Sequence, residues 1–105
     1  MADSLDALEQ LIRTRRTGDP ASSYVARLTA KGRAKIAQKV GEEAVEAAIA
    51  AVQDDAPGLV GEAADLVFHL LVLLADMGLS LDDIRAELTR REGVSGLDEK
   101  AARPA

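Results

Sequence analysis

The stretch that decides the fold is LVGEAADLVFHLLVLLAD, residues 59–76. Its composition favours a helix, and apolar side chains cover every side of that helix except one strip. The strip holds Glu62, Asp65, His69 and Asp76, and it contains no Lys or Arg. We therefore predict a helix over residues 59–76 that other helices surround on most of its sides.

Four further helices are predicted around this one, over residues 4–16, 22–30, 34–53 and 81–91. Gly18-Asp19-Pro20, Gly32 and the turn at residues 54–58 separate them. Alternating β-branched runs, which would indicate strands, are absent. We expect a single all-α domain over residues 1–105, a bundle of about five helices with an irregular tail at about 92–105. The two long helices should pack antiparallel, because their connection is short.

Composition excludes several classes of site. The chain has 105 residues, no Cys and one His, so disulfides, thiolate metal sites and zinc sites built from several imidazoles are excluded. Any bound metal must be held by oxygen, which points to Mg²⁺ or Mn²⁺. With one Phe, one Tyr and no Trp, the core is small, and we expect oligomerisation to add stability.

Charge and hydropathy limit the partners and the location. A net charge of −5 argues against a nucleic-acid partner. The acidic start of the chain lacks the pattern of a signal peptide, and the longest apolar run, residues 70–75, is too short to span a membrane. We expect a cytoplasmic protein without a membrane partner.

Two acidic pairs lie on the two long helices. Glu43 and Glu46 are three residues apart, as are Glu62 and Asp65, so each pair lies on one helix face. Antiparallel packing can bring the pairs together. Glu43 also falls in an apolar stripe with Ile36, Val40 and Ala47.

A charged strip is usually the solvated side of a helix, and that interpretation stays open for this one. Solvated faces normally mix signs, however, and the Glu43 stripe has no solvated explanation. Four carboxylates without cations would repel one another, and a divalent ion removes that penalty. Inward carboxylates from facing helices are a known way to build such a site in a helical bundle. The pattern therefore favours a Mg²⁺ site.

Basic residues and His69 have two interpretations each. Lys31, Lys35 and Lys39 recur every four residues and either bind phosphates or form a solvated face, with pairs such as Lys39 and Glu43. His69 is either a satisfied buried histidine or a donor that orients a metal-bound carboxylate. Lys100 and Arg103 in the tail are weaker candidates for phosphate binding.

The chain resembles the phosphoribosyl-ATP pyrophosphohydrolase family of all-α nucleotide pyrophosphohydrolases, which are MazG-like. The resemblance lies in Ser23-Tyr24-Val25, Ala30-Lys31-Gly32, residues 35–46, residues 62–74, Gly78-Leu79-Ser80-Leu81 and residues 95–101. It implies Mg²⁺-dependent hydrolysis of phosphoribosyl-ATP to phosphoribosyl-AMP and pyrophosphate, the second step of histidine biosynthesis, by a homodimer. We expect the dimer partner to complete the helical bundle; a site within one chain and a site that spans two both stay open.

The resemblance also implies roles for single residues. The metal ligands carried over from the family are Glu43, Glu46, Glu62 and Asp65. Glu42 is assigned to orienting or deprotonating the attacking water. Tyr24 and Phe68 fit core positions better than a site. Ser23 and Tyr24 nevertheless match the family motif, which makes them candidates for contact with the ribose or phosphates of the substrate.

Two other functions remain open from sequence. One is a house-cleaning nucleoside triphosphate pyrophosphohydrolase with the same metal site and another substrate. The other is a non-catalytic helical dimerisation module, for which removal of the acids would be neutral or stabilising.

Overall fold

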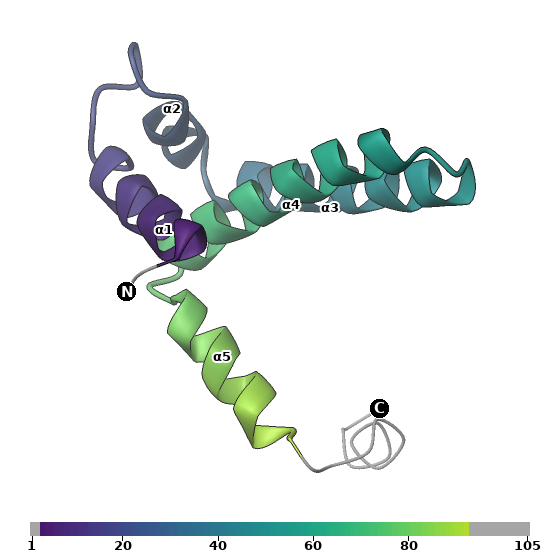
Figure 1. Ribbon diagram of the computed structural model, residues 1–105. Coiled ribbons are helices and arrows are strands. Elements are labelled where there is room, and N and C mark those ends of the chain that lie inside the picture. The colour runs from purple at the N-terminus through teal and green to yellow at the C-terminus, as the bar shows by residue number, and fades with distance from the viewer. Residues whose placement is uncertain (1–2, 93–105) are drawn as a thin grey trace.

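Five helices make up most of the chain in the computed structural model, which describes residues 3–92 (Figure 1). They are α1 (Ser4–Arg15), α2 (Tyr24–Lys31), α3 (Arg33–Val52), α4 (Ala56–Asp76) and α5 (Leu81–Arg90). The described range contains no strand. The predicted all-α fold and the number of helices are confirmed.

The helices are arranged around one long hairpin. Helices α3 and α4 run antiparallel side by side, as predicted, and α1 and α2 pack at the end of this pair opposite its turn (Figure 1). Helix α5 extends away from the end of α4 and has no buried residue. The main packing is therefore between α3 and α4, with α1 and α2 closing one end.

Local capping explains where most of the helices begin. The Asp3 side chain accepts a hydrogen bond from the Asp6 amide in a capping box, and Ser80 and Asp83 form another at α5. Between α2 and α3, Gly32 has φ of 100°, which other residues rarely adopt, so the predicted break there is confirmed.

The predicted turn at residues 54–58 is wrong in its second half. Ala56, Pro57 and Gly58 form the first turn of α4, and the Asp55 carboxylate caps it by accepting from the Gly58 amide at 3.0 Å. Proline fits there because the first amides of a helix have no partner within the helix. Asp54, with φ of 58°, supplies the tight reversal instead.

The hydrophobic core lies where α1 and α2 meet the hairpin. Its buried members are Ile12, Val25, Leu28, Ile36, Leu71 and Val72. Beyond Glu43, the buried apolar residues of α3 are only Ala47 and Ala50. The half of the hairpin nearer its turn is therefore thin, and it has little core of its own.

Two ion pairs stabilise the end of the hairpin opposite its turn. The Asp76 carboxylate, at the end of α4, accepts from Arg16 at 3.0 Å and from Arg33 at 2.9 Å. The Arg33 hydrogen bond is the main cause of a lowered pKa at Asp76. These contacts join α1, α3 and α4. Asp76 therefore pairs with two arginines, unlike the other acids of its strip.

Helix α4 is long and apolar enough to cross a membrane by length and composition, with mean hydropathy of 1.8 over its most apolar window. The core helix of a soluble domain passes the same test. In this fold α4 packs against α1, α2 and α3, and it carries Glu62, Asp65 and His69. Within this fold, 17% of that apolar window is buried.

Candidate functional site

A buried acid and a buried histidine meet between the two long helices. The His69 Nδ1 atom on α4 lies 2.6 Å from Glu43 Oε2 on α3, and the two residues are 6% and 7% exposed. The predicted apolar stripe places Glu43 there, since Ile36 and Ala47 on the same face are also buried. The prediction that Glu43 points inward is confirmed.

His69 has partners on both ring nitrogens. Nδ1 also lies 2.9 Å from the Asp65 carbonyl oxygen, and Nε2 lies 2.8 Å from the Tyr24 hydroxyl oxygen. The interpretation of His69 as a buried histidine with satisfied hydrogen bonds is confirmed. Its role as the donor that orients a metal-bound carboxylate stays a prediction.

A second acidic contact lies one turn further toward the hairpin turn. The pKa of Glu62 is raised, chiefly by a hydrogen bond with the Glu46 carboxyl group. Partial burial contributes next, followed by the charges of Glu46, Asp65 and Glu43. The other three predicted acids therefore all lie close enough to Glu62 to raise its pKa.

These acids do not form a ready-made metal cage. Among residues 3–92, no three His, Cys, Asp or Glu side chains are grouped as ligands of one ion. The donor chemistry nevertheless fits Mg²⁺, because Mg²⁺ prefers carboxylate oxygens as ligands. The neighbouring carboxylates raise the pKa of Glu62, and a bound cation would offset their repulsion. Binding an ion would require the glutamate side chains to rotate toward a common point.

Glu42 lies away from the buried pair. It is exposed and accepts a hydrogen bond from Gln38 Nε2 at 2.8 Å. It shares a shallow groove on α3 with Glu46, and the groove is lined by Gln38, Gly41, Glu42, Val45, Glu46 and Ile49. Glu42 thus borders the acidic site from the outer face of α3.

The predicted lysines keep their ammonium groups available for a ligand. Lys31 is exposed, and Lys35 and Lys39 are half-buried. In the part of the chain that the structure describes, none of the three forms an ion pair. The predicted alternative pair of Lys39 with Glu43 is wrong, because Glu43 turns inward to His69.

Ser23 and Tyr24 begin α2 at the edge of the site. The Ser23 hydroxyl accepts from the Ala26 amide at 3.2 Å, so it caps the helix. Tyr24 is 46% exposed, although its hydroxyl reaches His69. The core alternative for Tyr24 is wrong for that reason. Lys100, Arg103 and the tail predicted from about residue 92 lie almost wholly outside the described residues.

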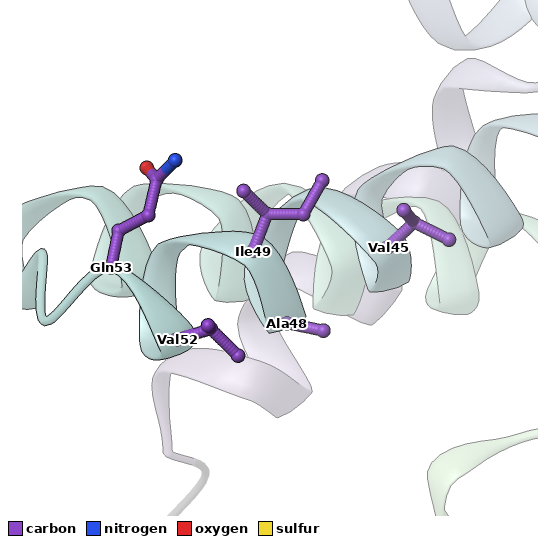
Figure 2. Close-up of a pocket in the computed structure, with 5 residues that line it drawn as sticks. All are labelled: Val45, Ala48, Ile49, Val52 and Gln53. Carbon is purple, nitrogen blue, oxygen red and sulfur yellow. The ribbon is translucent and has the colours of Figure 1, made fainter.

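An apolar groove runs along the outer side of α3 next to the Glu42 groove. Figure 2 shows its lining side chains, Val45, Ala48, Ile49, Val52 and Gln53. Val45, Ile49 and Val52 are 59%, 49% and 87% exposed. This surface belongs to the half of the hairpin nearer its turn, which has the fewest buried apolar side chains.

Sequence reasoning missed two contacts. These are the hydrogen bond of Tyr24 to His69, 45 residues apart, and the pairing of Asp76 with Arg16 and Arg33. No local spacing could have indicated them, because each joins helices that only tertiary packing brings together.

Comparison with known proteins identifies the family. The family model described as phosphoribosyl-ATP pyrophosphohydrolase matches residues 5–92. A phosphoribosyl-ATP pyrophosphatase of Rhizorhabdus wittichii is 62% identical over 104 residues, which cover 99% of this chain and 98% of the relative. The protein of the same name from Zymomonas mobilis is 57% identical, covering 97% of this chain and 95% of the relative. The chain therefore belongs to the phosphoribosyl-ATP pyrophosphohydrolase family.

Proposed function

We propose that this chain hydrolyses phosphoribosyl-ATP at the anhydride between its α and β phosphates, giving phosphoribosyl-AMP and pyrophosphate. This is the second step of histidine biosynthesis, and it takes place in the cytoplasm. Two supports carry the proposal: the family to which the chain belongs, and the crowding of acids that raises the pKa of Glu62.

The proposed metal ligands are Glu43, Glu46, Glu62 and Asp65, and the proposed metal is Mg²⁺. When bound, the ion would neutralise the phosphate chain and polarise the anhydride. Glu43 has a fixed orientation for this task, because His69 donates to it from a buried position. Glu46 and Glu62 come from facing helices, and Glu46 is near enough to raise the pKa of Glu62.

The proposed phosphate contacts are Lys31, Lys35 and Lys39. Lys35 and Lys39 lie on the same flank of α3 as Glu46, because these positions differ by multiples close to a helical turn. Lys39 and Glu46 are seven residues apart, a rise of about 10 Å. A chain of phosphates along this flank would meet cations at one end and acids at the other.

Glu42 is proposed to orient or deprotonate the attacking water. Its carboxylate is solvent-exposed and shares a groove with Glu46. Gln38 donates to it and limits its rotation. A base at the rim, beside acids that hold a metal, suits the activation of a water molecule from solvent.

The apolar face of α3 supports a homodimer. A second copy that packs on Val45, Ile49 and Val52 would supply the core that the thin half of the hairpin lacks. Because this face adjoins the groove of Glu42 and Glu46, the partner would also close one side of the site. The variant Ile49→Glu should yield a monomer in sedimentation, while Leu88→Glu, at a more exposed apolar position on α5, should not. A monomeric wild-type protein would contradict the dimer.

The test of the activity is release of pyrophosphate from phosphoribosyl-ATP, with and without Mg²⁺. Glu43→Gln and Glu62→Gln should abolish release while circular dichroism shows retained helix. The matched control is Asp82→Asn, which removes an acid that is 86% exposed on α5. A panel of nucleoside triphosphates separates this substrate from that of a house-cleaning enzyme. Absence of release with any divalent metal would refute the proposal.

A further inference from the structure

We propose that Tyr24 is a positioning residue that acts on Glu43 through His69, and that it does not act by contacting the substrate. The inference rests on the proposed function in one respect, which is that Glu43 is a metal ligand. Its geometric basis is a chain of hydrogen bonds that starts at α2, crosses α4 and ends at α3.

The hydrogen bonds of His69 fix where its proton lies. Nδ1 faces two acceptors, Glu43 Oε2 at 2.6 Å and the Asp65 carbonyl oxygen at 2.9 Å, so Nδ1 must carry a hydrogen. Nε2 is then free to accept from the Tyr24 hydroxyl, 2.8 Å away. Glu43 and the Asp65 carbonyl already select this tautomer, so what the Tyr24 hydroxyl adds is the ring orientation that donates to Glu43.

Aromatic contacts, which also include Phe68, hold Tyr24 and His69 together. The Tyr24 ring stacks on Phe68 with centroids 6.1 Å apart, and Phe68 meets the His69 ring edge-on at 5.2 Å. Helix α2 is itself fixed by buried Val25 and Leu28, directly after Tyr24. The hydroxyl thus comes from an anchored helix, which suits a positioning role.

Tyr24 is nevertheless 46% exposed, so contact with substrate is the competing role. The two roles differ in what they affect. A positioning residue alters His69 and the affinity for metal in the absence of substrate, whereas a substrate contact alters KM and leaves both unchanged.

The first measurement uses metal-free, ¹⁵N-labelled protein at a single pH. His69 is the only histidine of the chain, so its two ring nitrogens can be observed without assignment. In the wild type we expect a protonated Nδ1 and an unprotonated Nε2. Tyr24→Phe keeps the ring on Phe68 but removes the hydrogen-bond partner of Nε2, so the Nε2 signal should shift while Nδ1 stays protonated by its two acceptors. The control Thr29→Val removes another α2 hydroxyl, which bonds only the Val25 carbonyl, and it should leave both signals unchanged.

The second measurement is Mg²⁺ affinity by calorimetry. Tyr24→Phe should weaken binding about two- to tenfold, the range of one hydrogen bond. His69→Asn keeps a donor near Nδ1 but loses the acceptor for Tyr24. Tyr24→Phe should therefore cost nothing further in the His69→Asn background.

Three outcomes would overturn the inference: unchanged histidine signals in Tyr24→Phe, unchanged Mg²⁺ affinity, or the same loss of affinity in both backgrounds. A wild-type protein that binds no Mg²⁺ would refute the proposed metal site. The histidine signals would then still decide whether Tyr24 orients His69, so the two failures are distinguishable.

Discussion

The contact between Glu43 and His69 should be the most costly one to break by a single substitution. His69→Leu removes the donor to a carboxylate that is 7% exposed, at a heavy-atom distance of 2.6 Å. A hydrogen bond to a charged group contributes about 1.5–3 kcal/mol, and stranding a fully buried charge costs about 3–5 kcal/mol. Glu43 can regain some water by rotating, so we expect a loss of about 2–3 kcal/mol in the free energy of unfolding.

Urea unfolding followed by circular dichroism measures this loss, in metal-free protein at a fixed concentration because dimerisation adds to stability. The melting temperature should fall by about 8–24 °C, since 1 kcal/mol corresponds to about 4–8 °C in a domain of this size. The double variant Glu43→Met/His69→Leu should recover much of the loss, because neither partner is then left alone. If His69→Leu costs less than about 0.5 kcal/mol, well below a charged hydrogen bond, the buried pair is not formed as described.

Three other substitutions test separate parts of the structure. Glu62 has a raised pKa, so its ionised form opposes folding at neutral pH. Glu62→Gln should therefore stabilise the metal-free protein at pH 7, and thermal melts over a pH series should show this difference vanish as the pH falls below 4.5, the ordinary pKa of a glutamate. Asp76 has a lowered pKa, so its contribution to stability is present above pH 3.8 and is lost as the pH falls. Asp76→Asn should lower the free energy of unfolding by about 1–2 kcal/mol at pH 7 and by little near pH 2. An unchanged unfolding midpoint at pH 7 would refute the ion pairs with Arg16 and Arg33. A Cβ at Gly41 would meet nothing within 4 Å, so Gly41→Ala should raise the free energy of unfolding by about 0.5–1 kcal/mol; a loss would mean that a second copy packs against that position.

Much of the fold could be predicted because helices are local structures. Spacing of apolar residues, capping residues and glycines fix where the chain is helical, and the helical period fixes which residues share a face. The same period placed Glu43 among Ile36 and Ala47, all of which are buried. The one clear boundary error is at the start of α4. Pro57 predicts a break in the helix, whereas the first turn of a helix tolerates proline.

The sequence by itself determined that acids on two long helices, with few compensating cations, would lie near one another. Only the tertiary structure decided their partners. His69 bonds Tyr24 across 45 residues, and Asp76 binds Arg16 across 60 rather than joining the acids of its own strip. Periodicity orders side chains around one helix, but the register and crossing of helices choose what each face meets. Those depend on how the whole core packs, which no local pattern encodes.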